Sequence, residues 1–304
     1  MDNDLSTSFC TITTDAWARV RDSQGAVFET LIGITPDKYA DDTLDPRKAE
    51  DMAEVLAAYA PLQGKTVLEI GTGCGVNHIV WRKKFAVDGW GVEPEGEGFE
   101  SSAAIARDLI AANGLDPTRI KNAAGENLPF ADASFDIVYS SNVLEHVNDP
   151  ARVLREAVRV LRPGGTLQIV CPNYLSYFDG HYGAIHPPIF WNGFFRWWMK
   201  WIYRKDPWFA ATIRTEINPF WVRRQLREIS TTTPLTIHTL GQDKFRARMV
   251  DADVGRWMAL GTVGKLVRLG HALGINRLAA TIIIALQGWT PLIITLTKEG
   301  SKSR

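Results

Sequence analysis

The sequence has few cysteines and no excess of charge of either sign, and each of these two features argues against a class of protein. Its 304 residues hold three cysteines, Cys10, Cys74 and Cys171, and no two of them have the spacing of a disulfide framework or a zinc cluster. We therefore expect neither disulfides nor a metal site, and a chain of this length can bury a core without them. Basic and acidic residues number 34 each, which argues against a nucleic-acid partner.

A secretory signal is also lacking, because no basic region followed by an apolar run opens the chain. The sequence therefore predicts a cytoplasmic protein. One uncharged run, Leu278–Thr297, is long enough to cross a bilayer as a helix. However, Gly288 and Pro291 stand in a cluster of turn-forming residues in its middle. We expect a helix that ends near Leu286, then a turn, then a strand over Leu292–Thr297.

From residue 65 onward, short apolar strands alternate with helical stretches, which is typical of a parallel α/β sheet. Strands are expected over Lys65–Ile70, Gly89–Glu93, Arg119–Asn122, Phe135–Ser140, Thr166–Cys171, Leu235–Leu240 and Leu292–Lys298. Helices are expected over Pro46–Tyr59, Val76–Phe85, Glu100–Asn113, Ala151–Leu161 and Pro219–Ile229. The pattern predicts a Rossmann-like, doubly wound, mostly parallel seven-stranded sheet with helices on both faces.

The parts of the chain that break this alternation divide it into segments. Residues 1–60 form an N-terminal prelude, and residues 61–172 are the expected cofactor-binding core. Residues 173–217 are aromatic-rich and are interpreted as a cap that contributes to the substrate site. Residues 218–304 complete the core, with a helical insertion over 251–286 before the last strand.

A glycine-rich turn follows the first predicted strand, where Gly71, Gly73 and Gly75 stand before a helix. Glycines let a ligand approach the backbone closely, and the helix N-terminus offers free N–H groups. Glu93 ends the next strand, where an acid can bind the two hydroxyls of a ribose. The GxGxG spacing differs from the GxGxxG of dinucleotide sites. S-adenosyl-L-methionine has no phosphate, so a turn that holds it needs only to accommodate an amino acid and a ribose. The turn alone does not separate this cofactor from a dinucleotide.

Four motifs in order resemble those of class I S-adenosylmethionine-dependent methyltransferases, of the small-molecule, lipid or glycan type called methyltransferase domain 11-like. The motifs are Val67–Asn77, then Gly125–Phe130 with Ser134–Val138, then Leu144-Glu145-His146-Val147, and finally Leu161–Leu167. The resemblance covers about residues 45–175 and extends less closely to 218–242 and 291–298. His146 within the third motif is interpreted as an anchor for the start of the following helix.

The resemblance also implies roles for single residues. Gly71, Gly73 and Gly75 would line the methionine and ribose parts of the cofactor, with Glu69 orienting the turn. Glu93 would hold the ribose hydroxyls. Glu126 and Asn127 would edge the adenine, and Ser141 and Asn142 would face the methyl donor. Many relatives have an aspartate where this chain has Ala124. Glu126 is the expected substitute.

The cap supplies the candidate catalytic residues, His181 and Tyr182. Methyl transfer is an in-line displacement, so the protein mainly aligns the reactants and can supply a base. The segment Asp179–Gly183 is similar to an element of relatives that act on sugars or lipid-linked glycans, and a histidine there can act as a base near neutral pH. In the alternative interpretation, both side chains only join the cap to the core.

Tryptophans and basic residues gather between residues 189 and 228. Six of the eleven tryptophans lie there with eight lysines and arginines. This mixture suits a peripheral contact with the inner face of a membrane, and the insertion over 251–286 could provide a second contact. An aromatic-lined substrate pocket is the alternative, and base stacking on nucleic acid fits the zero net charge less well. We expect a methyltransferase for a small lipidic or glycan-linked acceptor, or a non-catalytic membrane-surface scaffold of the same fold.

Overall fold

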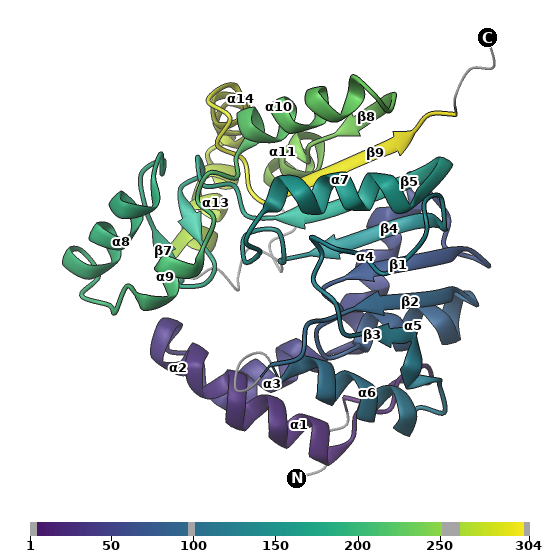
Figure 1. The fold of residues 1–304 in the computed structure, drawn as a ribbon. Helices are drawn as coiled ribbons and strands as arrows, with labels where there is room; N and C mark the ends of the chain where they lie inside the picture. The colour runs from purple at the N-terminus through teal and green to yellow at the C-terminus, as the bar shows by residue number, and fades with distance from the viewer. Residues whose placement is uncertain (1–4, 97–100, 251–261, 301–304) are drawn as a thin grey trace.

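A seven-stranded sheet organises the computed structural model, which describes residues 5–96, 101–250 and 262–300. Its strands lie in the order β3-β2-β1-β4-β5-β9-β8 (Figure 1). They are β1 (Thr66–Ile70), β2 (Asp88–Val92), β3 (Ile120–Lys121), β4 (Phe135–Ser141), β5 (Leu161–Cys171), β8 (Leu235–Thr239) and β9 (Leu292–Lys298). The pairs among β1 to β5 are parallel, whereas β9 is antiparallel to both β5 and β8. The predicted Rossmann-like, mostly parallel sheet is confirmed.

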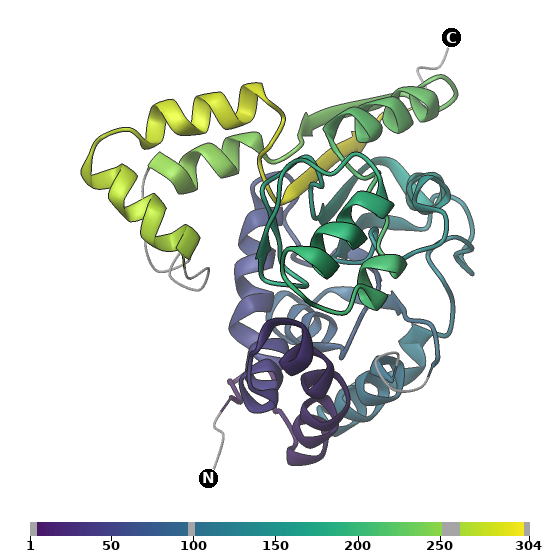
Figure 2. The same ribbon diagram turned by 90° about the vertical axis from the view of Figure 1, so that its left-hand side faces the viewer.

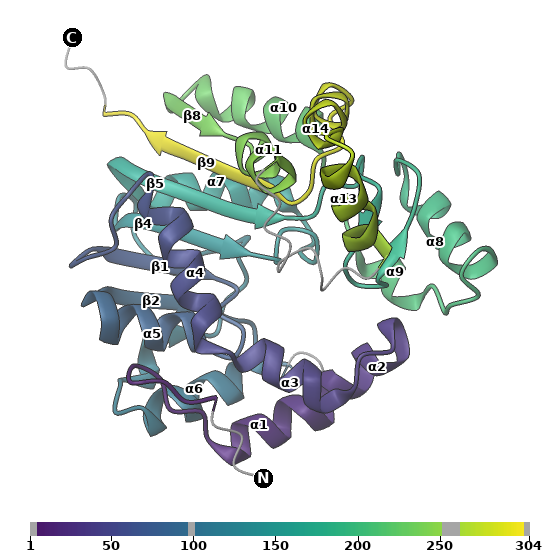
Figure 3. The same ribbon diagram turned by 180° about the vertical axis from the view of Figure 1, so that it is seen from behind.

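Helices cover both faces of this sheet, as a comparison of Figures 1 and 3 shows. One face carries α4 (Pro46–Ala57) and α5 (Val76–Phe85), with α6 (Ser102–Ala112) in the same apolar cluster, and the other carries α7 (Pro150–Val160) and α10 (Pro219–Ser230). Successive strand residues point to opposite faces. Accordingly, Val67 of β1 belongs to the cluster of α4 and α5, and Leu68 belongs to the cluster of α7.

The prelude contains more helix than the sequence predicted. Besides α4, it forms α1 (Thr14–Val20), a π-helical turn (Arg21–Gly25), α2 (Ala26–Ile32) and α3 (Pro36–Leu44). Side-chain caps define these short helices: Thr13 accepts from the Ala16 N–H, and Thr35 accepts from the Lys38 N–H.

The cap follows β5 and lies on the side of the sheet toward which the parallel strands point (Figure 1). It consists of a hairpin, β6 (Phe178–Asp179) and β7 (Ala184–Ile185), with α8 (Asn192–Trp201) and α9 (Trp208–Thr212). Ligands of open α/β sheets bind at the carboxyl ends of the strands. The cap is therefore placed over the edge where a cofactor site is expected.

The helices between β8 and β9 project from the sheet beside the cap (Figure 2). They are α11 (Gln242–Val250), α13 (Thr262–Ala272) and α14 (Asn276–Ala285), so the helical segment begins before residue 251. Residues 251–261 of the predicted insertion lie outside the described residues. As predicted, α14 ends before a turn and β9 follows it. Among the described residues, none of the helices is both long and apolar enough to cross a bilayer.

The start of β5 differs from the prediction. We expected Arg162–Gly165 to separate the preceding helix from a strand beginning at Thr166. Instead, Leu161 already pairs with Phe135 of β4, and the register then shifts so that Thr166 pairs with Ile137. The intervening residues bulge out of the ladder, which accommodates the proline and glycines inside the strand.

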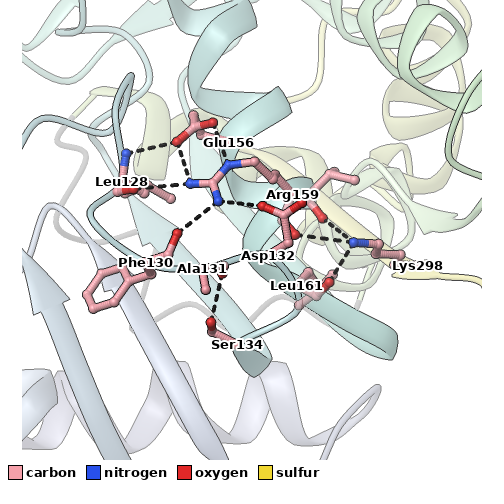
Figure 4. Close-up of polar contacts among 10 residues, drawn as sticks. Leu128, Phe130, Ala131, Asp132, Ser134, Glu156, Arg159, Leu161 and Lys298 are labelled. Carbon is pink, nitrogen blue, oxygen red and sulfur yellow. Dashed lines mark hydrogen bonds and ion pairs between the residues drawn. The ribbon is translucent and has the colours of Figure 1, made fainter.

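Arg159 at the end of α7 ties this helix to the loop that precedes β4 (Figure 4). Its guanidinium donates to the carbonyl oxygens of Leu128 and Phe130 and to the carboxylates of Asp132 and Glu156, at 2.8–3.1 Å. The same helix end also receives Lys298 of β9, which donates to the Leu161 carbonyl at 2.7 Å. Cations are favourable at a helix C-terminus because the last carbonyl groups lack partners within the helix.

We expect Arg159→Ala to lower the free energy of unfolding by about 2 kcal/mol, because several charge-assisted hydrogen bonds are lost at a partly exposed site. Urea unfolding measures this change. Arg155→Ala is the control, since Arg155 lies one turn earlier on α7 and makes only a 3.7 Å pair with Asp149. Equal stabilities of the two variants would contradict this role of Arg159.

Candidate functional site

The glycine turn between β1 and α5 has left-handed backbone at all three glycines, with φ of 75° at Gly71, 54° at Gly73 and 84° at Gly75. The reason for glycine differs among them. A Cβ on Gly71 would stand 2.1 Å from Val143, and one on Gly75 would stand 3.2 Å from Ala106. A Cβ on Gly73 would meet nothing within 4 Å. Gly71 and Gly75 therefore allow close packing within the protein, whereas Gly73 faces open space.

Glu93 lies directly beside this turn, because β2 pairs in parallel with β1 and Ile70 is opposite Val92. The Gly73 N–H donates to Glu93 Oε2 at 2.8 Å. Burial raises the pKa of Glu93, and the hydrogen bond from Gly73 opposes that rise. The predicted pairing of turn and acid is thus present in the fold, and the carboxylate is held in a fixed position.

Gly91 makes this approach possible and was not singled out from the sequence. A Cβ at Gly91 would stand 2.2 Å from Thr72 Oγ1. The GWGV pattern before Glu93 could have indicated this role of Gly91, since a glycine inside a buried strand indicates close approach by another segment.

Glu69 is buried in β1 beneath the turn. Asn77 of α5 donates to Glu69 Oε1 at 2.7 Å, and Oε2 has no hydrogen-bond partner among the described residues. Burial raises the pKa of Glu69 to about 8, and the hydrogen bond from Asn77 lowers it in part. Glu69 is therefore held beneath the turn by α5, and burial favours its protonated form. Its role in orienting the turn stays a prediction.

The residues predicted around the adenine and the methyl donor lie on two loops at the same edge. Glu126 Oε1 accepts from the N–H groups of Asn148 and Asp149, at 2.8 and 3.3 Å, so this carboxylate joins its loop to the start of α7. Asn127 is exposed. Ser141 ends β4, and Asn142 follows it with left-handed backbone and an exposed side chain. Their contacts with a cofactor stay predictions.

The cap brings His181 against the loop that follows β4. His181 Nδ1 lies 3.2 Å from Asp179 Oδ2, and His181 Nε2 lies 3.2 Å from His146 Nε2. Glu145 is fully buried beside them, 3.9 Å from His146 and 4.0 Å from His181. Sequence reasoning missed this cluster, although the Leu144–Val147 motif contains both loop residues.

Burial and charge set opposing protonation preferences in this cluster. Burial raises the pKa of Glu145 to about 7 and lowers that of His146 to about 3. Burial also disfavours the charged form of His181, but the hydrogen bond and charge of Asp179 outweigh it and raise the His181 pKa. His181 lies within hydrogen-bond distance of Asp179 and His146, and Glu145 lies 3.9 and 4.0 Å from the two imidazoles.

Tyr182, the other candidate catalytic residue, has its hydroxyl fully engaged in the cap. That hydroxyl donates to the Asp206 carbonyl at 3.0 Å and accepts from the Ala210 N–H at 2.9 Å. The Tyr182 N–H also donates to Asp179 Oδ1 at 2.8 Å. All these contacts lie within the cap and not between the cap and the core, and the catalytic role of Tyr182 stays a prediction.

The prelude closes against the cap. Lys205 of the cap donates to the carbonyl oxygens of Leu31 and Tyr182. Phe28 of α2 stacks on Tyr39 and packs edge-on against Phe209, with ring centroids 6.2 Å apart. The first sixty residues thus help to enclose the carboxyl side of the sheet.

This sheet order, the glycine turn and the acid after β2 are those of a Rossmann-like domain. In a comparison of sequences, residues 68–169, about a third of the chain, match the family model described as "Methyltransferase domain". This segment is a methyltransferase domain. The match spans β1 to β5 and therefore contains the glycine turn, Glu93 and the loop after β4.

Relatives with curated sequences share this part of the chain. A protein of Mycobacterium sp. (strain JLS), named an uncharacterized methyltransferase, is 39% identical over 118 residues, which are 39% of this chain and 43% of that protein. One from Mycobacteroides abscessus with the same name is 39% identical over 124 residues, 40% and 44% of the two chains. The chain thus spans less than half the length of these relatives.

Solved structures extend the likeness of fold over most of the chain. A candidate sarcosine dimethylglycine methyltransferase from Galdieria sulphuraria matches with a TM-score of 0.51 and 17% identity, covering 85% of this chain and 88% of that one. A chain from the complex of the Haloferax volcanii Trm112 methyltransferase activator with a candidate methyltransferase matches with a TM-score of 0.50 and 16% identity, covering 95% and 100%. Identities this low establish the fold alone.

Proposed function

We propose that this chain is an S-adenosyl-L-methionine-dependent methyltransferase that transfers the methyl group in line to a small lipidic or glycan-linked acceptor. The main support for this proposal is the hydrogen bond from the Gly73 N–H to Glu93 Oε2, because it joins the turn and the acid at the carboxyl edge of the sheet. A ribose bound by Glu93 would place the methionine part of the cofactor over the turn. The methyltransferase domain at residues 68–169 supports this assignment.

The acceptor would enter from the cap side. The sulfonium donor is already activated, so alignment is the main requirement. Ser141 and Asn142 would lie beside the methyl group, and His181 would contribute from the cap. The loop that carries Asn142 also carries His146, which contacts His181 and thereby connects the donor side to the acceptor side.

We expect Glu93→Gln to weaken S-adenosylhomocysteine binding by roughly 10–100-fold, because charge-assisted hydrogen bonds to the ribose are lost. Isothermal titration calorimetry measures this change. Glu95→Gln is the matched control, since Glu95 is exposed and pairs with Arg107. A wild-type chain that binds neither cofactor form at millimolar concentration would contradict the enzyme and favour the non-catalytic scaffold.

The acceptor class is inferred from the exposed face of α8. Phe195 and Met199 are buried one turn apart, whereas Trp197 and Trp201 are 49% and 62% exposed on the opposite face. Lys200 lies 5.3 Å from the Trp201 ring. Exposed tryptophans with neighbouring cations suit the headgroup region of an anionic membrane, from which a lipidic acceptor could be taken.

A second apolar stripe lies on α13 and α14, which stand beside the cap in Figure 2. Exposed leucines and isoleucines recur at helical spacing along the two helices and at the residue that follows each of them: Leu266, Leu269, Leu273, Leu278, Ile282 and Leu286. An apolar stripe of this kind normally faces a partner or a lipid surface. We propose that it adds to the same membrane contact.

Flotation with anionic liposomes tests this contact. We expect the wild-type chain to float and the double variant Trp197→Ser/Trp201→Ser to partition roughly tenfold less, equivalent to about 1.4 kcal/mol. Ile237→Ser is the control, because Ile237 is 43% exposed on β8, outside residues 189–228 and 251–286. If the wild-type chain stays in the soluble fraction at low ionic strength, the membrane contact is excluded.

A further inference from the structure

Three side-chain atoms around the loop after β4 converge on a single point. Glu145 Oε1 lies 3.9 Å from His146 Nε2 and 4.0 Å from His181 Nε2, and the two nitrogens lie 3.2 Å apart. The point equidistant from atoms at these separations is about 2.2 Å from each, which is the length of a zinc bond to a protein nitrogen or oxygen.

The orientation of the two imidazoles agrees with this convergence. Their ring centroids are 5.0 Å apart and their planes are nearly perpendicular, at 89°. A straight N–H···N hydrogen bond of 3.2 Å would hold the centroids further apart than this. The two rings are therefore not in line along the contact between their Nε2 atoms, and both nitrogens lie within 4.0 Å of Glu145 Oε1.

Glu145 supplies an independent indication. Its side chain is fully buried, and neither carboxylate oxygen has a hydrogen-bond partner among the described residues. Its backbone is fixed, because the Arg214 N–H donates to the Glu145 carbonyl at 2.8 Å. A buried carboxylate without partners is costly, and buried charges are normally paired or coordinate metals. A cation between Glu145 and the two histidines would remove that cost.

Asp179 completes the arrangement expected around a metal-binding histidine. Its Oδ2 lies 3.2 Å from His181 Nδ1, and its Oδ1 accepts from the Tyr182 N–H at 2.8 Å. Histidines that bind metals usually donate their other ring N–H to a carboxylate, which fixes the tautomer and the ring orientation. Asp179 thus leaves His181 Nε2 free to act as a ligand.

We propose that Glu145, His146 and His181 bind one divalent transition-metal ion, zinc by preference, with Asp179 as a positioning residue. Two imidazoles and one carboxylate favour zinc and its neighbours over magnesium or calcium, which prefer all-oxygen ligands. Three protein ligands leave a coordination position open. The side chain of His146 is 29% exposed, so water or an oxygen of the acceptor can reach that position.

The part of this inference that concerns the acceptor rests on the proposed function. Asn142, predicted to face the methyl donor, precedes Glu145 by three residues in the same loop. An acceptor oxygen bound to the ion would therefore stand close to the donor. The ion would lower the pKa of an acceptor hydroxyl, which is a task otherwise left to a general base.

Calorimetric titration of the EDTA-treated, untagged full chain with zinc tests the site, and cobalt absorption reports the ligand geometry. We expect one ion per chain, with no detectable binding by Glu145→Gln or His181→Gln. Asp179→Asn should weaken binding roughly 10–100-fold. His238→Gln is the control and should bind normally, because His238 lies on β8 and contacts Thr297.

Absence of zinc binding by the wild-type chain, or equal binding by Glu145→Gln and His238→Gln, would overturn the metal site. Binding of magnesium but not of zinc would contradict a site formed by two imidazoles and one carboxylate. S-adenosylhomocysteine titration of the same samples separates this result from the proposed function and confirms that the variants are folded. We expect Glu145→Gln to retain that binding. Zinc binding without cofactor binding would refute the methyltransferase and leave the metal site standing.

Discussion

Gly73→Leu is expected to abolish binding of S-adenosylmethionine while leaving the chain folded. A Cβ at this position would meet no atom within 4 Å, so the new side chain clashes with nothing in the protein. It would instead fill the space above the turn that the proposed cofactor needs. The left-handed backbone at residue 73 adds a cost of about 1–2 kcal/mol for a residue with a Cβ. Affinity should fall more than a hundredfold.

Gly164→Leu is the matched control for this experiment. Gly164 also has left-handed backbone, with φ of 79°, and a Cβ there would also meet nothing within 4 Å. It lies in the bulged part of β5, away from the carboxyl ends of the strands. Both variants should lose similar stability in urea, and only Gly73→Leu should lose the cofactor. Cofactor binding within threefold of wild type by Gly73→Leu would refute the placement of the ligand over the turn.

Glu69→Gln is expected to stabilise the cofactor-free chain at alkaline pH. Burial raises the pKa of Glu69 to about 8, with a further contribution from the charge of Glu93 and an opposing one from Asn77. Between pH 4.5 and 8 the folded chain therefore binds this proton more tightly than the unfolded chain does. Its free energy of unfolding falls as the pH rises through that window. The neutral glutamine avoids this loss and can still accept the hydrogen bond from Asn77.

Thermal unfolding from pH 5 to pH 9 without cofactor measures the difference. The stability advantage of Glu69→Gln should be near zero at pH 5 and reach roughly 2–5 kcal/mol by pH 9. Glu228→Gln is the control, because Glu228 lies on α10 with a side chain that is 60% exposed. A constant difference between Glu69→Gln and wild type across this range would show that Glu69 is not the titrating group.

The cofactor side of the site could be predicted from the sequence because its signals are local. The turn from Gly71 to Gly75 immediately follows one strand, and Glu93 immediately follows the next. In a parallel sheet, adjacent strands bring their carboxyl ends together, so residues at those ends must meet. The mostly parallel sheet with helices on both faces followed from the alternation of strands and helices, whereas the order of the strands was not predicted.

The cluster at the cap could not be predicted in this way. His146 and His181 are 35 residues apart, and their meeting depends on the β6-β7 hairpin and on contacts of Phe209 with both rings. Nothing in the spacing of these residues resembles a metal motif. The helix α8 was also missed, because tryptophans on its exposed face and Phe195 on its buried face hide the amphipathic pattern.

The position of β9 has a consequence for synthesis of the chain on the ribosome. Residues 292–298 lie between β5 and β8, and among the strands that the structure describes β8 pairs with β9 alone. While the nascent chain is shorter than this, β5 presents an unpaired edge, and β8 has no place in the sheet. Unpaired strand edges favour aggregation. The edge of β5 is therefore sealed only once residues 292–298 have been synthesised and have left the ribosome, and chains that stall before residue 292 should require chaperones.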